Sequence, residues 1–384
     1  MKKILVIALS TFCLMFTAYG HAEITFQGFA SFVGGMTLDN DDDSYLGYEN
    51  KLEYDKNSLY ALQASSSMGE GLTVTGQLIA RGTENYKPEF EWLYVSYNLT
   101  PTLNIKMGRI RTPFYMFSEY LEVGYTYHWI RPPVEVYAAQ VTNVDGVSFL
   151  YNLPIGNIDS QYMLTIGNRE SYSDDPDTRV SDYKPLVASN AQFEFEKYTV
   201  KLIYVQGDVT AETTGIDAAA APLTDTSFVN KYIKFQDSTV VFSGVGFDID
   251  LHPMKVLLEY ALVDFQDHML IADETRLLAS FVYSFGISSV HYSWSANSVD
   301  TVSGIAAKAT GNSTISLDGG TTFLPNSVIA AGFPSVDRDV VTHTIGLRHD
   351  FHDSAAFKVE LISTENSSID TDATLVRFGV DMLF

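Results

Sequence analysis

The last eleven residues of the chain, Thr374 to Phe384, alternate between apolar and polar positions with a period of two. One parity is almost entirely apolar and consists of Thr374, Val376, Phe378, Val380, Met382 and Phe384. The other parity carries the charges, at Arg377 and Asp381. Successive side chains of a β-strand point to opposite faces, so this pattern predicts a strand with one apolar and one polar face.

The same alternation recurs along the chain in segments of about ten residues, the length that spans a membrane as a tilted strand. Apolar positions of one parity define segments at Ile24–Phe32, Leu72–Ala80, Leu93–Tyr97, Val147–Tyr151, Tyr162–Ile166, Phe193–Phe195, Tyr198–Tyr204, Val256–Tyr260, Val290–Trp294, Ile345–Leu347 and Phe357–Leu361. The opposite parity carries polar side chains such as Gln77, Lys201 and Glu259. So many two-faced strands favour a membrane barrel over a soluble sandwich.

The connections between these segments are of two kinds. The short ones lie at Met68–Gly71, Thr100–Thr102, Pro154–Asn157, Glu196–Lys197, His252–Met254, Gly286 and His352–Ser354. The long ones lie at Thr37–Asn57, Pro113–Thr142, Arg169–Val187, Val209–Phe235 and Val299–Asp339. Short periplasmic turns that alternate with longer extracellular loops are typical of a transmembrane barrel.

The strand count follows from a parity rule. A bacterial barrel chain starts and ends on the periplasmic side, so its strand number is even. Tyr45 to Tyr54 alternates weakly and would make the total seventeen, so we place it in the first loop. Open sheet edges are costly in lipid. The sequence therefore predicts an all-β fold, a closed transmembrane antiparallel β-barrel of sixteen strands.

The N-terminal segment predicts export. Lys2 and Lys3 precede an apolar run from Ile4 to about Ala18, and Gly20-His21-Ala22 supplies small residues for a cut after Ala22. Residues 1–22 are therefore predicted to be a secretory signal peptide, and residues 23–384 a single barrel domain. Cys13, the only cysteine, lies in the removed segment, so the mature chain uses neither disulfides nor thiol ligands.

Composition excludes two classes of protein. The longest apolar stretches, such as Met254–Val263, are interrupted by charges, so a helical membrane protein is excluded. The net charge of −23 argues against a nucleic-acid partner. The 23 tyrosines and 24 phenylalanines against 3 tryptophans suit strands with aromatic belts at the two membrane interfaces.

The region from Trp92 to Leu150 carries the most specific local signal. It contains the run Met107-Gly108-Arg109-Ile110-Arg111-Thr112-Pro113-Phe114 and, further on, Trp129-Ile130-Arg131-Pro132-Pro133-Val134-Glu135-Val136-Tyr137. With the strand pattern, this region resembles the Gram-negative outer-membrane diffusion porins, although the Pro-Glu-Phe-Gly-Gly signature of their third loop is absent. The architectural resemblance covers the whole mature chain.

The resemblance implies a location, an assembly and a function. The third extracellular loop of such porins folds back into the barrel and narrows it, which here would be residues 113–142. It implies a homotrimer in the outer membrane, in contact with lipid and lipopolysaccharide, that passes small hydrophilic solutes and ions by passive diffusion without a cofactor. A terminal strand that ends on phenylalanine resembles the signal recognised by the barrel-assembly machinery, a role for Phe384.

The residues of that loop favour an inward position independently. The loop is rich in rings, at Phe114, Tyr115, Phe117, Tyr120, Tyr125, Tyr127, Trp129 and Tyr137, and Pro132 and Pro133 stiffen it. The alternative is packing on the outer rim or on a neighbouring subunit. Sixteen strands leave a water-filled lumen, whereas eight would be filled by side chains.

Charged residues are the candidates for selectivity, because a low-dielectric wall strengthens fixed charges at a constriction. On the loop these are Glu119, Glu122 and Glu135, with Arg131 as counter-charge. On the wall, alternation places Arg81 inside, and the resemblance points to Arg109 and Arg111. Because Ile105 and Met107 share their parity, both arginines would face lipid unless a bulge at Gly108 turned them inward.

Arg348 and Arg377 also fall on the inward parity. For each arginine the alternative is a salt bridge or a place at the rim, without a role in selectivity. The surplus of acids predicts a mild preference for cations.

Two acidic loops, Asp39–Asp43 and Asp174–Asp177, raise the question of calcium. An EF-hand would need glycine at Ser44 and glutamate at Asn50, so a solvated loop is the favoured interpretation. A looser hypothesis, which chelator treatment tests, is that divalent cations bridge these loops to lipopolysaccharide phosphates.

Three other functions remain as alternatives. His291 with Ser289 and Ser293 on one inward face could form a hydrolase site, but no catalytic signature occurs and we predict that the protein is not an enzyme. A substrate-selective channel could use Tyr120, Tyr125 and Trp129 as a track for sugars. An adhesin or phage receptor could use the long loops.

Overall fold

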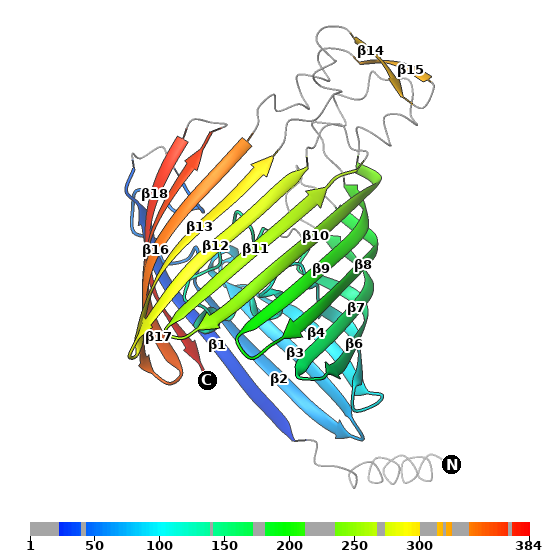
Figure 1. The fold of residues 1–384 in the computed structure, drawn as a ribbon, viewed down its shortest axis with the longest axis horizontal. Coiled ribbons are helices and arrows are strands. Elements are labelled where there is room, and N and C mark those ends of the chain that lie inside the picture. The colour runs from blue at the N-terminus through cyan, green and yellow to red at the C-terminus, as the bar shows by residue number, and fades with distance from the viewer. Residues whose placement is uncertain are drawn as a thin grey trace, which may run out of the picture.

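The computed structural model describes residues 23–39, 44–138, 141–171, 181–211, 235–266, 273–299, 313–317, 320–324, 338–367 and 371–384. Most of them belong to a closed antiparallel β-barrel of sixteen strands (Figure 1). The barrel strands are β1 (Ile24–Thr37), β2 (Leu59–Gly69), β3 (Leu72–Arg81), β4 (Pro88–Asn98), β5 (Leu103–Arg111), β6 (Asn143–Ile155), β7 (Ile158–Ser171), β8 (Ser181–Glu194), β9 (Tyr198–Ala211), β10 (Phe235–Leu251), β11 (Met254–Asp264), β12 (Glu274–Phe285), β13 (Ser288–Val299), β16 (Arg338–His352), β17 (Ala355–Asn366) and β18 (Thr371–Leu383). The predicted fold class and strand number are confirmed.

The barrel closes where the first strand pairs with the last. Each barrel strand pairs with the barrel strands before and after it in the chain, and β1 pairs with β18. The Gly28 N–H donates to the Phe384 carbonyl at 2.7 Å, and the Phe384 N–H donates to the Gly28 carbonyl at 3.0 Å. The terminal residue is therefore part of the closing ladder, which removes the edges that lipid could not satisfy.

A separate hairpin lies within a connection that the sequence predicted to be a loop. Strands β14 (Ser313–Leu317) and β15 (Gly320–Leu324) form a two-stranded sheet of their own, so β13 pairs directly with β16. Among the described residues, no helix is long and apolar enough to cross a membrane.

The two faces of the wall differ as the alternation predicts. Large apolar side chains point outward and are exposed, as at Phe32, Met107 and Ile345. Charged side chains of the opposite parity, such as Lys358 and Arg377, are buried inside. A charge on the lipid face costs about 2–4 kcal/mol at the membrane midplane, so this separation fixes which face of each strand points outward.

The turns lie where the sequence places them. The short turns contain Gly71, Gly156 and Gly286, each with a positive φ that glycine adopts without strain. Tyr45 to Tyr54 contributes only isolated bridges, Gly35 to Glu53 and Tyr45 to Tyr48, so its assignment to the first loop is confirmed.

One loop boundary was wrong. The loop expected at Arg169–Val187 is shorter, because β7 continues to Ser171 and β8 begins at Ser181. The signal peptide and the acidic loop at Asp174–Asp177 lie outside the described residues, as does most of the acidic run at Asp39–Asp43. Their roles stay predictions.

Candidate functional site

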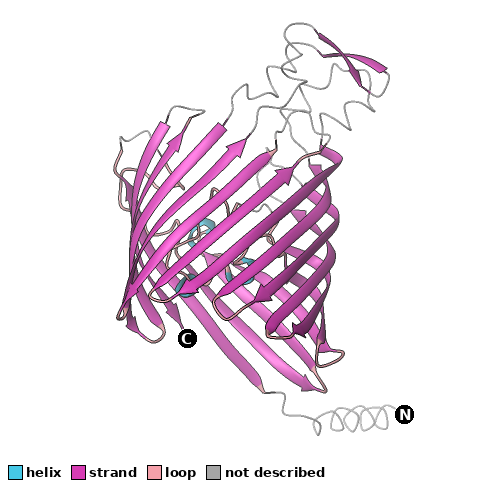
Figure 2. Ribbon diagram, in the orientation of Figure 1, coloured by secondary structure: helices cyan, strands magenta, loops and turns pink. Residues whose placement is uncertain are grey.

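The residues between β5 and β6 form the candidate site, and we call their described part, residues 112–138 and 141–142, the inner segment. Its two ends meet, because the Thr112 N–H donates to the Thr142 carbonyl at 2.8 Å. Between them the chain makes two short helical turns, η3 (Ser118–Tyr120) and η4 (Gly124–Thr126), which lie within the outline of the barrel (Figure 2). Its hydrogen bonds end on inward-facing side chains of strands around the barrel, so the inner segment lies against the inner face of the wall.

Cations of the wall hold the backbone of the inner segment. Five of them donate to its carbonyls: Arg111 to Ser118, Lys201 to Met116, Arg276 to Val136 and Ala138, Arg348 to Tyr125 and Tyr127, and Lys358 to Gly124 and Trp129. An irregular segment cannot pair its own carbonyls as a helix or strand does, and a buried carbonyl without a donor is costly. An ammonium or guanidinium group supplies several donors at once.

Two acidic side chains of the wall accept hydrogen bonds from backbone N–H groups of the inner segment. Glu259 of β11 accepts a hydrogen bond from the Met116 N–H at 3.1 Å and another from the Tyr137 hydroxyl. Glu360 of β17 accepts from the Ile130 N–H at 2.8 Å and is paired with Arg377 at 2.7 Å. Each acid thus ties the inner segment to the wall.

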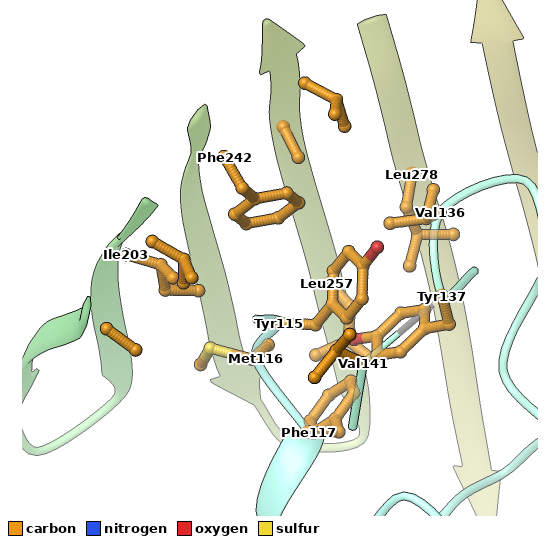
Figure 3. Packing of buried hydrophobic residues seen from close by; sticks show 14 of the residues in the cluster. Tyr115, Met116, Phe117, Val136, Tyr137, Val141, Ile203, Phe242, Leu257 and Leu278 are labelled. Carbon is orange, nitrogen blue, oxygen red and sulfur yellow. The ribbon is translucent and has the colours of Figure 1, made fainter. Parts of the chain in front are cut away.

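A hydrophobic cluster fixes one side of the inner segment to β8–β12. Figure 3 shows Tyr115, Met116 and Phe117 from one limb and Val136, Tyr137 and Val141 from the other, packed with side chains of the wall. The wall contributes Val144 of β6 and, from β8–β12, Leu186, Ala188, Ile203, Val205, Phe242, Leu257, Ala261, Val263 and Leu278. Inward-facing apolar residues are unexpected for a polar lumen, and the inner segment is what covers them.

The histidine of the inner segment is neutral. Burial, together with the neighbouring His291, holds the pKa of His128 well below its ordinary value. Its Nε2 lies 2.9 Å from the Ser280 hydroxyl, and the adjacent Trp129 donates to the Ser293 hydroxyl at 2.8 Å. This part of the segment is therefore bound to β12 and β13 by uncharged polar contacts.

Four of the predicted charges join the inner segment to the wall. Arg81 pairs with Glu122 at 3.0 Å, and Glu119 pairs with Lys201 at 2.9 Å. Arg111 donates to the Ser118 carbonyl at 2.8 Å and forms an ion pair with Glu91. Each of these charges is therefore paired with an opposite charge of the inner segment or of the wall.

Glu135 and Arg131 have fixed partners as well. Glu135 is buried and accepts hydrogen bonds from Tyr45 at 2.8 Å, Ser295 at 2.9 Å and Thr342 at 2.7 Å. Arg131 donates to the Asn57 carbonyl at 3.1 Å, which connects the inner segment to the first loop.

The prediction for Arg109 was wrong. Arg109 lies opposite Leu93 and Asp145, on the parity that points outward, and pairs with Asp145 at 3.0 Å. Gly108 has a φ of +133°, but the pairing of β5 with β4 and β6 continues through it without a shift. Alternation therefore holds at Arg109, whereas Arg111, at the end of β5, departs from it: Arg111 is buried and reaches the Ser118 carbonyl of the inner segment.

Several charged residues that hold the inner segment were not selected from the sequence. Lys201, Glu259, Lys358 and Glu360 lie on inward parities, and Arg276 on β12 does so too. They could have been identified as ionisable residues in the middle of a strand, on its polar face. Such a residue is far from both rims, so it needs a partner inside the barrel.

The structure also places the residues named for a hydrolase site, a sugar track and a metal site. Ser293 is buried under Trp129, and His291 has no hydrogen bond to it, so these residues do not form an accessible hydrolase site. Trp129 is only 1% exposed, and so cannot line a track for sugars, whereas Tyr120 is 38% exposed. The described residues hold no group of three or more His, Cys, Asp or Glu side chains that could bind a metal ion.

Comparison with solved structures defines the class of fold: the barrel is similar to those of outer-membrane porins. The chain is similar to a loop-deletion mutant of OmpT of Vibrio cholerae, with 10% identity over 95% of this chain and 100% of that one, and a TM-score of 0.57. The anion-selective porin of Comamonas acidovorans gives the same identity, coverage and TM-score. OmpF of Salmonella typhi, in complex with daunomycin, has 12% identity over 94% of this chain and 98% of that one, and a TM-score of 0.58.

The similarity is one of fold, because the identities are this low. No family model matches the sequence. A search of curated proteins also found no match.

Proposed function

We propose that the protein is an outer-membrane porin of a Gram-negative bacterium, a channel for the passive diffusion of small hydrophilic solutes and ions. The observation that carries the proposal is the closed sixteen-strand barrel with an apolar outer face and a charged inner face. A barrel of this size is wide enough to hold water when its lumen is free. Transport makes and breaks no bond, so the proposal needs neither a cofactor nor a catalytic residue.

Three further elements belong to the proposal. Residues 1–22 direct export and are removed, and Phe384 presents the finished strand to the assembly machinery. Three copies assemble, a state that one OmpT structure of Vibrio cholerae carries in its description as a trimer form. The acid surplus gives the channel a mild preference for cations, and an anion-selective reversal potential in a salt gradient would contradict that preference.

Liposome swelling tests the proposed function. Liposomes that contain the mature protein are expected to swell in isotonic solutions of small sugars, and more slowly as the sugar grows, because diffusion through a bore discriminates by size. Liposomes with heat-unfolded protein are the control. No swelling with either the wild type or a variant in which a short linker replaces residues 114–140 would contradict the proposal.

A further inference from the structure

A polar recess lies on the inner face of the wall. It is a cavity of about 280 Å³ formed by β6, β7 and β8, close to the short turns that follow β6 and β8. Its lining residues are Asn152, Leu153, Pro154, Asp159, Ser160, Gln161, Gln192 and Glu194. We call it the amide recess, because three side-chain amides line it.

The three amides form one row across the strands. Asn152 of β6 lies opposite Gln161 of β7, and Gln161 lies opposite Gln192 of β8. The Gln161 Nε2 donates to the Asn152 Oδ1 at 3.0 Å, and the Gln192 Nε2 donates to the Glu194 Oε1 at 2.6 Å. Within the described part of the chain, no hydrogen bond engages the Gln161 Oε1, the Gln192 Oε1 or the Asn152 Nδ2. The recess therefore offers both acceptors and donors that the protein does not use.

Two carboxylates lie next to the amides, where the strands reach the short turns. Asp159 of β7 lies directly opposite Glu194 of β8. Like charges that face each other across two strands are destabilising. Among the described residues neither carboxylate forms an ion pair, and Glu194 has only the hydrogen bond from Gln192. Stability of the sheet alone therefore does not account for this pair of acids.

The row of amides ends beside the inner segment. Lys201 of β9 follows Gln192 in register, and its side chain is buried inside the barrel, so the amides on the same parity also point inward. Lys201 binds Glu119 of the inner segment at 2.9 Å, and the Glu119 side chain is 42% exposed. Water therefore reaches this contact, and a solute in the lumen would meet the recess next to it.

We propose that the amide recess binds a neutral polyhydroxylated solute, a molecule of the sugar or sugar-alcohol class. The inference rests on the proposed function and adds a site and a solute class to it. A hydroxyl group both donates and accepts a hydrogen bond, a carboxylate only accepts, and an amide does both through separate atoms. Neighbouring hydroxyls of one solute can therefore donate to Asp159 and Glu194 while they exchange hydrogen bonds with Gln161 and Gln192.

Simple ions fit the same groups less well. An anion would meet the carboxylates of Asp159 and Glu194. A metal cation would bind these carboxylates but would give the free Asn152 amide N–H group no acceptor. Each hydrogen bond to a solute replaces one to water, so its net value is small. We therefore expect a dissociation constant in the millimolar range, weak enough for a channel to release the solute.

The double variant Gln161→Leu/Gln192→Leu tests the site. Leucine is close to glutamine in size but neither donates nor accepts a hydrogen bond, and both positions are only half-buried. Saturation-transfer NMR measures the binding of sucrose to the refolded protein in detergent micelles. The affinity of the double variant is expected to be about tenfold lower than that of the wild type, because two hydrogen-bonding groups are lost. The single variant Gln192→Leu is expected to give a smaller loss.

Two controls show whether the effect belongs to this recess. Asn98→Leu removes an inward amide at the end of β4, which accepts a hydrogen bond from Asn104 at 2.7 Å but does not line the recess. This variant is expected to keep the wild-type affinity for sucrose. Polyethylene glycol of the same mass has ether acceptors but almost no donors, so it is expected to show no saturation transfer that the double variant removes.

The outcomes separate the recess from the channel. Gel mobility first confirms that each variant is folded. Equal affinity for sucrose in the wild type and the double variant, or a conducting wild type that binds no sucrose, would refute the recess and leave the channel in place. If neither the wild type nor the linker variant conducts in planar bilayers, the proposed function fails, and with it any role of the recess in transport, whether or not sucrose binds.

Discussion

Replacement of Lys358 by methionine is expected to lower the free energy of unfolding by about 3–5 kcal/mol, the cost of leaving the partner of a buried ion pair uncompensated. The Lys358 side chain is fully buried and pairs with Asp381 at 2.7 Å, and it donates to two carbonyls of the inner segment. Methionine keeps the length of the side chain but provides no donor. Asp381 would lose its ion pair with Lys358 and keep the hydrogen bond from the Ser31 hydroxyl. Urea unfolding of the refolded protein in lipid vesicles, followed by tryptophan fluorescence, measures the loss.

Lys255→Met is the matched control for this prediction. Lys255 also sits on an inward face and pairs with Asp248 at 2.8 Å, but its side chain is 40% exposed. Water and rotamer entropy reduce the value of such a pair to about 0–1 kcal/mol. Equal losses in the two variants would show that Lys358 does not hold the inner segment against β17 and β18.

Replacement of Phe384 by alanine is expected to remove most of the folded barrel from the outer membrane of cells while leaving the purified protein able to refold. The Phe384 ring stacks on Tyr60 with centroids 5.6 Å apart and is 59% exposed, so its loss costs about 1 kcal/mol of stability. Alanine retains the backbone N–H and C=O that pair with Gly28. A large effect in cells would therefore reflect recognition by the assembly machinery.

The difference between folded and heated samples in gel mobility measures assembly in cells, and urea titration measures stability in vesicles. Phe26→Ala is the control, because Phe26 also lies at an exposed site on the outer face, in β1, and is 62% exposed. Equal amounts of assembled barrel in the Phe384→Ala and Phe26→Ala strains would contradict the role of the terminal ring.

The barrel was predictable from the sequence because lipid imposes the alternation locally. Outward positions within the membrane are mostly apolar and inward ones face water or the inner segment, so parity alone identifies the strands. The even-number rule settles Tyr45–Tyr54. The β14–β15 hairpin was missed because it lies in a connection without such a constraint. The boundary at Ser171 and Ser181 was missed because a strand that continues beyond the membrane no longer needs to alternate.

The site was predictable only in part, because it depends on contacts between residues far apart in the chain. The aromatic content identified the inner segment, and alternation placed Arg81 on the inner face. No local pattern shows that Glu135 meets Ser295 and Thr342, or that Glu259 meets Met116. Arg109 shows the opposite error. The family resemblance placed it on the inner face, but alternation, which places it on the outer face, is correct at this position.

Single-channel recording of the variant in which a linker replaces residues 114–140 tests the central claim most directly. A closed sixteen-strand barrel without its inner segment is expected to give stable current steps of uniform size that are larger than any step of the wild type. A variant that shows the gel mobility of a folded barrel and yet leaves the bilayer without current would contradict the existence of a continuous aqueous bore.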